Sequence, residues 1–184
     1  DALTDADFNV ALGVASLSSD TLGSKSTALG YGSLTNQNFT TATDTQNTAV
    51  GFQAGTNVTT ATFNTLIGSL AGTSLTTGTN NTFIGALAGD AFDVGAFNTA
   101  VGMGALSTDV HGSRSTALGY FALVDQNFAT TTDVYNTAVG YAAGVAVTTG
   151  IQNTLIGGLA GDAITDADYN VAVGMGSLGA NTVG

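Results

Sequence analysis

Small and aliphatic residues recur in this chain as one five-residue element, Asn-Thr-Ala-Val-Gly with small variations. The element occurs ten times, beginning at residues 9, 26, 47, 64, 81, 98, 115, 136, 153 and 170, so that successive copies are 17 or 21 residues apart. Its first position is Asn or Ser, its second Thr or Val, its fourth Val, Ile or Leu, and its fifth always Gly. Such a period predicts a repeat array in which each unit buries its apolar surface against its neighbours.

The repeating unit is best explained as a short β-strand followed by a bend. The element is small and β-branched and ends in Gly, as a strand does before a turn. A helix is disfavoured because each interior Gly costs about 1 kcal/mol relative to Ala, and a propeller blade needs about 40 residues. We therefore predict an all-β fold in which residues 1–184 form a single parallel β-solenoid, or β-roll, of ten 17- or 21-residue coils. At about 4.8 Å per coil, the rod is about 48 Å long.

A longer repeat is superimposed on the coils. The segment that begins at Asp1 returns at Asp162, 161 residues later, and a near-copy begins at Asp90. We therefore expect this chain to be a piece of a longer array, or to continue into a neighbouring subunit. The two 21-residue coils carry insertions that share Gln-Asn-Phe and a later Asp, Asp44 or Asp133. These insertions predict a fixed bulge on one edge.

Stacking in register places equal positions of successive coils in columns along the rod. The first position predicts a ladder of side-chain hydrogen bonds, formed by Asn47, Asn64, Asn81, Asn98, Asn136 and Asn153. Strand alternation puts the second and fourth positions on one face and the third on the other. Because the fourth position is always aliphatic, we predict that it faces the core, with Thr of the second position buried beside it. The third position is never polar, which predicts an outer face covered by other copies in a homotrimer or a filament.

The composition of the chain argues against several classes of protein. Of the 184 residues, 43% are hydrophobic and 8% are charged, which favours a folded chain over a disordered one. A net charge of −11 with only two Lys or Arg residues argues against nucleic-acid partners, because phosphate binding needs cations. No apolar run approaches the roughly 20 residues of a membrane-spanning helix, so we expect no membrane span in this segment.

The sequences Asn-Val-Ala-Leu-Gly from Asn9, Ser-Thr-Ala-Leu-Gly from Ser26 and Asn-Thr-Ala-Val-Gly from Asn98 resemble the head repeats of the YadA-like trimeric autotransporter adhesins. Similar repeats occur in phage tail fibres. The resemblance covers essentially the whole chain, and it implies a left-handed β-roll, three chains per fibre and an extracellular position at a cell or virion surface. It also implies a host surface, matrix protein or glycan as partner. The coils here are longer than those of the family and Thr replaces its usual Val, so a single-chain filament is an alternative to the trimer.

Few residues of this chain could act as a catalytic acid, base or nucleophile, and we expect no enzyme activity and no catalytic residues. The single His, His111, lies between Asp109 and Ser113 in a return segment. Catalytic triads are seldom assembled from such near neighbours in sequence. The Gly residues fit no phosphate-binding motif.

Calcium is the one cofactor that the sequence suggests. Carboxylate and amide oxygens alternate along two equivalent runs, namely Asp5, Asp7 and Asn9 and again Asp166, Asp168 and Asn170. Hard oxygen ligands suit Ca²⁺, which takes about six to eight of them. The interpretation that we favour is solvated Asp in a turn.

These patterns together predict a structural or adhesive extracellular fibre, such as the shaft of a surface filament, adhesin or tail fibre. One alternative is an adhesin head that binds a ligand or glycan, with aromatic side chains beside the element stacking on sugars; packing between coils or subunits is the preferred interpretation of these rings. The other alternative is an ice-binding β-solenoid. That function needs Thr on an exposed face, whereas we place the Thr column beside the core.

Overall fold

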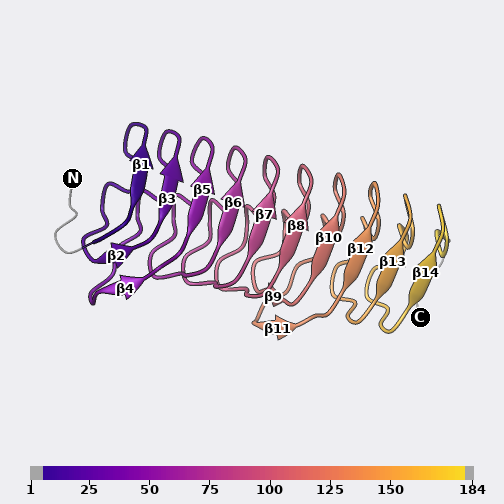
Figure 1. Cartoon of the computed structure of the whole chain (residues 1–184). Coiled ribbons are helices and arrows are strands. Elements are labelled where there is room, and N and C mark those ends of the chain that lie inside the picture. Colours follow the sequence, from indigo (N-terminus) through magenta and orange to yellow (C-terminus); the bar gives the residue numbers. More distant parts are fainter. Residues whose placement is uncertain (1–5, 181–184) are drawn as a thin grey trace.

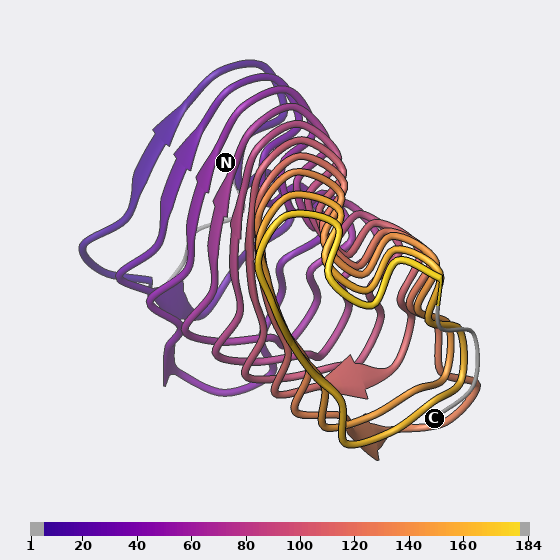
Figure 2. The ribbon, with the colours of Figure 1, turned by 90° about the vertical axis from the view of Figure 1, so that its right-hand side faces the viewer.

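The computed structural model of the chain describes residues 6–180, and every regular element in them is a β-strand. The predicted parallel β-solenoid is confirmed: coils stack along one axis into a rod whose two ends carry the two ends of the described chain (Figure 1). Viewed from the end, successive coils repeat the same outline (Figure 2). These residues contain no helix, and so none that could cross a membrane.

One ten-stranded parallel sheet runs the length of the rod. Each of its strands covers the second to fourth positions of one element. In sheet order the strands are β1 (Val10–Leu12), β3 (Thr27–Leu29), β5 (Thr48–Val50), β6 (Thr65–Ile67), β7 (Thr82–Ile84), β8 (Thr99–Val101), β10 (Thr116–Leu118), β12 (Thr137–Val139), β13 (Thr154–Ile156) and β14 (Val171–Val173).

Each 21-residue coil adds a small two-stranded parallel sheet at the side of the rod (Figure 1). The first pairs β2 (Gly23–Ser24) with β4 (Thr43–Asp44), and the second pairs β9 (Gly112–Ser113) with β11 (Thr132–Asp133). Two residues near the end of each longer return segment therefore pair with the preceding coil.

Neighbouring strands pair so that equal positions of the repeat lie opposite each other. Thr48 pairs with Thr65, Ala49 with Leu66 and Val50 with Ile67, and the same register holds between all neighbouring coils of the sheet. Backbone hydrogen bonds between coils continue beyond the strands, for example from Gln53 N to Tyr31 O at 2.8 Å. The rod is thus held by main-chain bonding around much of each coil.

The invariant Gly of the element has a steric cause. Gly85 has a φ of 133°, in a region that L residues rarely adopt, and a Cβ there would lie 2.5 Å from the carbonyl oxygen of Gly102 in the next coil. Coils stacked about 4.8 Å apart leave no room for that atom. The fifth position is therefore fixed by the close approach of two backbones.

The sheet faces the core with the opposite side from the one that the sequence predicts. The third position is the buried one: Ala49, Leu66 and Phe83 have 0% exposure. Thr65 and Ile67, on either side of Leu66, are half-exposed on the outside of the rod. The prediction that the fourth position is core and the Thr column is buried is wrong, because a strand that is apolar on both faces carries no local sign of which face is inside.

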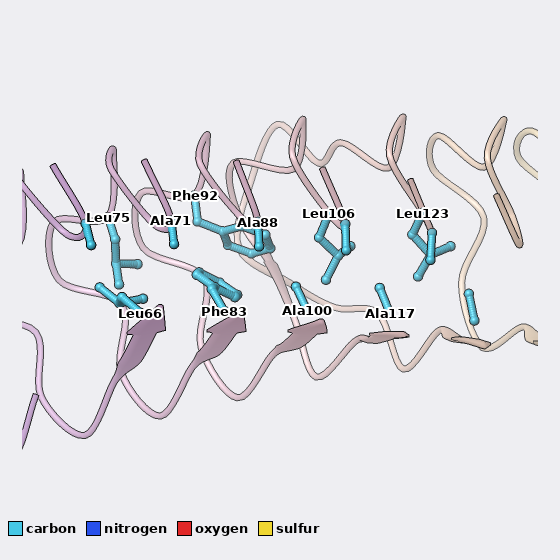
Figure 3. Close-up of a cluster of buried hydrophobic side chains, with 14 of the residues drawn as sticks. Leu66, Ala71, Leu75, Phe83, Ala88, Phe92, Ala100, Leu106, Ala117 and Leu123 are labelled. Atoms are coloured by element: carbon cyan, nitrogen blue, oxygen red, sulfur yellow. The ribbon is translucent and has the colours of Figure 1, made fainter. Parts of the chain in front are cut away.

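The core is a single narrow file of small and large side chains that compensate one another along the rod (Figure 3). Where the third position is Leu or Phe, the ninth is Gly; a Cβ at Gly89 would lie 2.6 Å from Phe83 Cδ2. In the next coil the third position is Ala100 and the ninth is Leu106, both fully buried. Most coils therefore supply one large side chain of this pair, from either wall. The exceptions are Ala49 with Gly55 and Ala138 with Gly144, where Leu66 and Leu155 of the next coils lie against the Gly.

Candidate interaction surface

The first-position side chains join neighbouring coils. Asn64 Oδ1 accepts a hydrogen bond from the backbone N of Asn81 at 2.9 Å, and its Nδ2 donates to Gly78 O at 3.0 Å, at the far end of its own coil. Each Asn thus ties its coil closed and bonds the next one. All six predicted ladder residues are at most 1% exposed, namely Asn47, Asn64, Asn81, Asn98, Asn136 and Asn153.

The ladder changes chemistry at the two 21-residue coils, where Ser replaces Asn. In the first, Gln37 Nε2 donates to Asp20 Oδ2 at 2.6 Å and to Ser26 Oγ at 3.1 Å. Gln37 Oε1 accepts from Asn47 Nδ2 at 2.9 Å. The insertion therefore supplies a Gln that reconnects the ladder, which sequence reasoning missed although Gln-Asn-Phe is common to both insertions.

The same network recurs around a second buried carboxylate, Asp109. Its Oδ2 accepts from Gln126 Nε2 at 2.6 Å and its Oδ1 from Gly112 N at 2.9 Å. Burial raises the pKa of Asp109, because the charged carboxylate is desolvated, and the hydrogen bond from Gln126 offsets part of that effect. Burial also raises the pKa of Asp90, one oxygen of which is buried without a hydrogen-bond partner.

Both cations of the chain occupy the same position in these two coils. Lys25 Nζ lies 2.5 Å from Asp44 Oδ2, and Arg114 Nε lies 2.9 Å from Asp133 Oδ1. Arg114 Cζ also lies 4.9 Å from the ring centroid of Phe97. The Asp that the two insertions share thus pairs with the cation.

The outer side of the ten-stranded sheet is a partly exposed, uncharged surface, which we call the Thr/aliphatic face. Its Thr column comprises Thr27, Thr48, Thr65, Thr82, Thr99, Thr116, Thr137 and Thr154, with Val10 and Val171 at the ends. Its aliphatic column comprises Leu12, Leu29, Val50, Ile67, Ile84, Val101, Leu118, Val139, Ile156 and Val173. None of these side chains is buried, and Leu29 and Ile156 are 41% and 39% exposed.

Two further columns border this face. The upstream rim is the residue before each element, and it comprises Phe8, Lys25, Gln46, Phe63, Asn80, Phe97, Arg114, Tyr135, Gln152 and Tyr169. The downstream rim is the residue after each invariant Gly, and it comprises Val14, Tyr31, Phe52, Ser69, Ala86, Met103, Tyr120, Tyr141, Gly158 and Met175. Neighbouring downstream rings stack, with the centroids of Tyr120 and Tyr141 5.5 Å apart. Half of the Phe63 and Phe97 side chains is exposed.

Five of the six candidate calcium residues lie in the described part of the chain. Asp5 lies outside the described residues, and both Asn side chains belong to the ladder: Asn9 Nδ2 donates to Gly23 O, and Asn170 Nδ2 to Asn153 Oδ1. Asp168 Oδ1 accepts from Ile151 N at 2.7 Å. Within residues 6–180, no three His, Cys, Asp or Glu side chains are placed to hold one ion. Calcium binding stays a prediction that titration must test.

The segment around His111 does not assemble a triad. His111 Nδ1 lies 3.0 Å from the carbonyl oxygen of Phe128, and Asp109 is engaged with Gly112 and Gln126. Ser113 Oγ accepts a hydrogen bond from Ala96 N. No cavity or cleft was found in the described part of the rod.

Comparisons with family models, with curated proteins and with solved structures gave no match to this chain. The resemblance to adhesin and tail-fibre repeats therefore stays a prediction from the sequence. The candidate functional site of this chain is therefore the outer surface of the rod described above.

Proposed function

We propose that this chain is a structural segment of an extracellular filament, the shaft of an adhesin or tail fibre, and that it self-associates through the Thr/aliphatic face. One observation carries the proposal: in every coil the fourth position of the element is aliphatic and lies on the outside of the rod. A column of partly exposed aliphatic side chains that runs the length of a rod is uncommon on a monomer and is typical of an interaction site.

The rod architecture supports the structural role. Repeat arrays of this type place nearly all contacts between neighbouring coils, so that length is added without changing the cross-section. Here equal positions pair between all neighbouring strands of the long sheet, the core is continuous, and the Asn ladder is carried through the two 21-residue coils by Ser and Gln. Such an object is suited to act as a stiff spacer that holds other parts of a protein away from a surface.

A second copy of this chain is the partner that fits the face best. Ten strands about 4.8 Å apart and a width of about 13 Å give roughly 600 Å² per copy, so two faces bury roughly 1,200 Å², the lower end of stable interfaces. The side chains of the face repeat with the strand spacing along the rod, and a second copy presents rows of side chains with the same spacing. None of the thirteen acidic residues lies in its two columns or in the downstream rim, so the net charge of −11 is kept off the contact.

The proposed location follows from the resemblance and the composition rather than from any observed partner. A host surface, matrix protein or glycan is the adhesive target that the resemblance implies, and the left-handed coil and the threefold assembly are likewise its implications. The absence of a cavity in residues 6–180 favours display or surface contact over enclosure of a small molecule.

Light scattering coupled to size exclusion tests the proposal. Wild type is expected to show a multiple of 18.1 kDa, and a triple variant of the face, Ile67→Asn, Ile84→Asn and Val101→Asn, is expected to be monomeric with an unchanged circular dichroism spectrum. The matched control places the same three changes on half-exposed Val residues of the return segments, at Val94, Val110 and Val145, and is expected to associate as wild type does. A wild-type chain that stays monomeric at high concentration contradicts the proposal.

Ice binding is a second candidate, because the structure removes the reason for setting it aside. The Thr column lies on the outside, in a regular array with the strand spacing. Two features oppose it: the neighbouring column is aliphatic, and half-exposed rings such as Phe63 and Tyr141 rise along both rims, whereas an ice-binding surface should be flat. Thermal hysteresis that is present in wild type and lost in Thr65→Val/Thr82→Val/Thr99→Val would establish this alternative.

A further inference from the structure

The two 21-residue coils enclose the same group of four polar side chains, which are a carboxylate, a hydroxyl, a carboxamide of Gln and a carboxamide of Asn. The group comprises Asp20, Ser26, Gln37 and Asn47 around the first of these coils and Asp109, Ser115, Gln126 and Asn136 around the second. All eight side chains are at most 1% exposed. A hydroxyl and a carboxamide that are shut off from water together, beside a carboxylate, are the reactants and the proton carrier of an acyl transfer.

The hydroxyl lies close enough to the carboxamide to attack it. Ser115 Oγ lies 3.1 Å from Gln126 Nε2. In the first coil, Ser26 Oγ lies 3.1 Å from Nε2 and 3.4 Å from Oε1 of Gln37. Since the oxygen and nitrogen of a carboxamide flank its carbon, a hydroxyl oxygen this close to both lies about 3 Å from the carbon, near the separation from which a nucleophile attacks.

The side chains around Gln126 favour such an attack. Asn136 Nδ2 donates to Gln126 Oε1 at 2.8 Å, where it would stabilise the negative charge that the oxygen gains in a tetrahedral intermediate. On the other side, Gln126 Nε2 donates to Asp109 Oδ2 at 2.6 Å, and Asp109 Oδ1 is held by Gly112 N. Burial raises the pKa of Asp109, which makes its carboxylate a better proton acceptor.

We infer that Ser115 and Gln126 join in an intramolecular ester. The bond from Ser115 Oγ to Gln126 Cδ forms, and the bond from Cδ to Nε2 breaks. Asp109 accepts the proton of the hydroxyl and passes it to Nε2, so that the nitrogen leaves as ammonia and Asp109 returns to its starting state. No oxidant, metal or other reactant is needed.

The second of the two coils is the reactive one because its hydroxyl is not shared. In the first coil, Ser26 Oγ forms a hydrogen bond with Thr45 Oγ, and Thr45 Oγ donates to Ser24 O at 2.9 Å. The hydrogen of Ser26 is therefore directed at Thr45. In the second coil Val134 occupies the position of Thr45 and offers no such acceptor.

The ester would replace a closure that this coil lacks. In the other coils an Asn at the first position donates to a carbonyl at the far end of its own coil, as Asn98 Nδ2 does to Gly112 O. Ser115 is too short for that contact, and an ester to Gln126 would close the coil covalently instead. Buried from water, it would resist hydrolysis. The inference goes beyond the proposed shaft function and needs no second copy, since a covalent tie withstands tension that separates hydrogen bonds.

Mass spectrometry of denatured wild type tests the inference. After incubation of the folded protein at neutral pH until its mass is constant, the chain is expected to be lighter than its sequence by about 17 Da, the mass of one ammonia. Cleavage before Asp residues separates fragment 109–124 from fragment 125–132, because Asp125 lies between Ser115 and Gln126. The two fragments are expected to stay joined, and hydroxylamine, which cleaves esters, is expected to release them.

Three variants assign the chemistry to these side chains. Ser115→Ala and Asp109→Asn are each expected to give two separate fragments of full mass. The matched control Ser26→Ala removes the equivalent buried hydroxyl of the first coil and is expected to keep fragments 109–124 and 125–132 joined. Folded wild type with separate, full-mass fragments overturns the inference, and so does a cross-link between them that persists in Ser115→Ala. The decisive measurement is made on wild type and does not depend on how well any variant folds.

Discussion

The exchange of volume between the third and ninth positions gives a sharp test of the core. Phe83 is fully buried, with its ring centroid 5.1 Å from that of Phe92. Phe83→Ala is expected to cost about 3–5 kcal/mol, because it deletes a buried ring and leaves a cavity. Gly89→Leu is expected to cost about 1–3 kcal/mol from overpacking against Phe83 and a further 1 kcal/mol or so from a side chain at a φ of 56°.

The double variant recreates the pair that the next coil already uses. Ala100 and Leu106 occupy these positions there, and Leu106 has a φ of 52°. Phe83→Ala/Gly89→Leu should therefore lose only about 1–3 kcal/mol, well below the sum of the single losses, with a coupling energy of at least about 2 kcal/mol. If the two single costs simply add, the two positions do not share one space and the description of the core is wrong.

Urea denaturation followed by circular dichroism measures this cycle. Equal slopes of free energy against urea among the four proteins show that the same amount of surface unfolds in each. That comparison matters for a solenoid, because a weakened coil can divide the array into parts that unfold separately. Ala86→Leu, on the exposed rim of the same coil, controls for the added side chain and is expected to change the stability by less than about 0.5 kcal/mol.

Three further outcomes are expected. Gly85→Ala should prevent stable folding, since its Cβ would lie 2.5 Å from the Gly102 carbonyl oxygen, while Ala86→Ser beside it should be neutral; a native circular dichroism spectrum for Gly85→Ala argues against this close stacking. Asn81→Ala should lower the unfolding free energy by about 1–3 kcal/mol in the same urea assay, because the buried carbonyl of Gly95 and the buried N–H of Asn98 lose their hydrogen-bond partner. A cost near zero contradicts the ladder. Because burial raises the pKa of Asp109, its stabilising contribution is complete below the ordinary value of 3.8 and is lost as the pH rises through the folded-state pKa. Asp109→Asn should therefore flatten part of the dependence of the unfolding free energy on pH. An unchanged pH dependence excludes this carboxyl as its origin.

The coil boundaries were predictable from the sequence because backbone geometry imposes them. An invariant Gly, a first position of Asn or Ser and a constant spacing each arise from contacts between adjacent coils, and these contacts recur ten times. The strands begin one residue after the predicted starts, as for Thr48 after Asn47. A physical constraint that acts in every coil leaves its trace in every repeat.

The inside and outside of the sheet were not predictable from the apolar pattern, since both faces are apolar. A usable signal was nevertheless present: the third position gains volume only where the ninth is Gly, as in Leu66 with Gly72 and Leu155 with Gly161. Volume exchange marks a closed space, whereas the fourth position varies among Val, Ile and Leu without any such partner. The Gln of the insertions was missed because its role depends on a Ser in another column.

The placement of charge bears on where association should stop. The Thr/aliphatic face carries no charged residue, and both cations lie beside Asp44 and Asp133, so the net charge of −11 is spread over the other sides of the rod. Once the faces are covered, an assembly presents only surfaces of like charge, which repel further copies at distances within the screening length of about 10 Å at 0.1 M salt. Added salt should therefore tighten the closed assembly without enlarging it. If light scattering instead shows a mass that grows continuously with salt, association uses surfaces other than this face, and the fibre is built by a different contact.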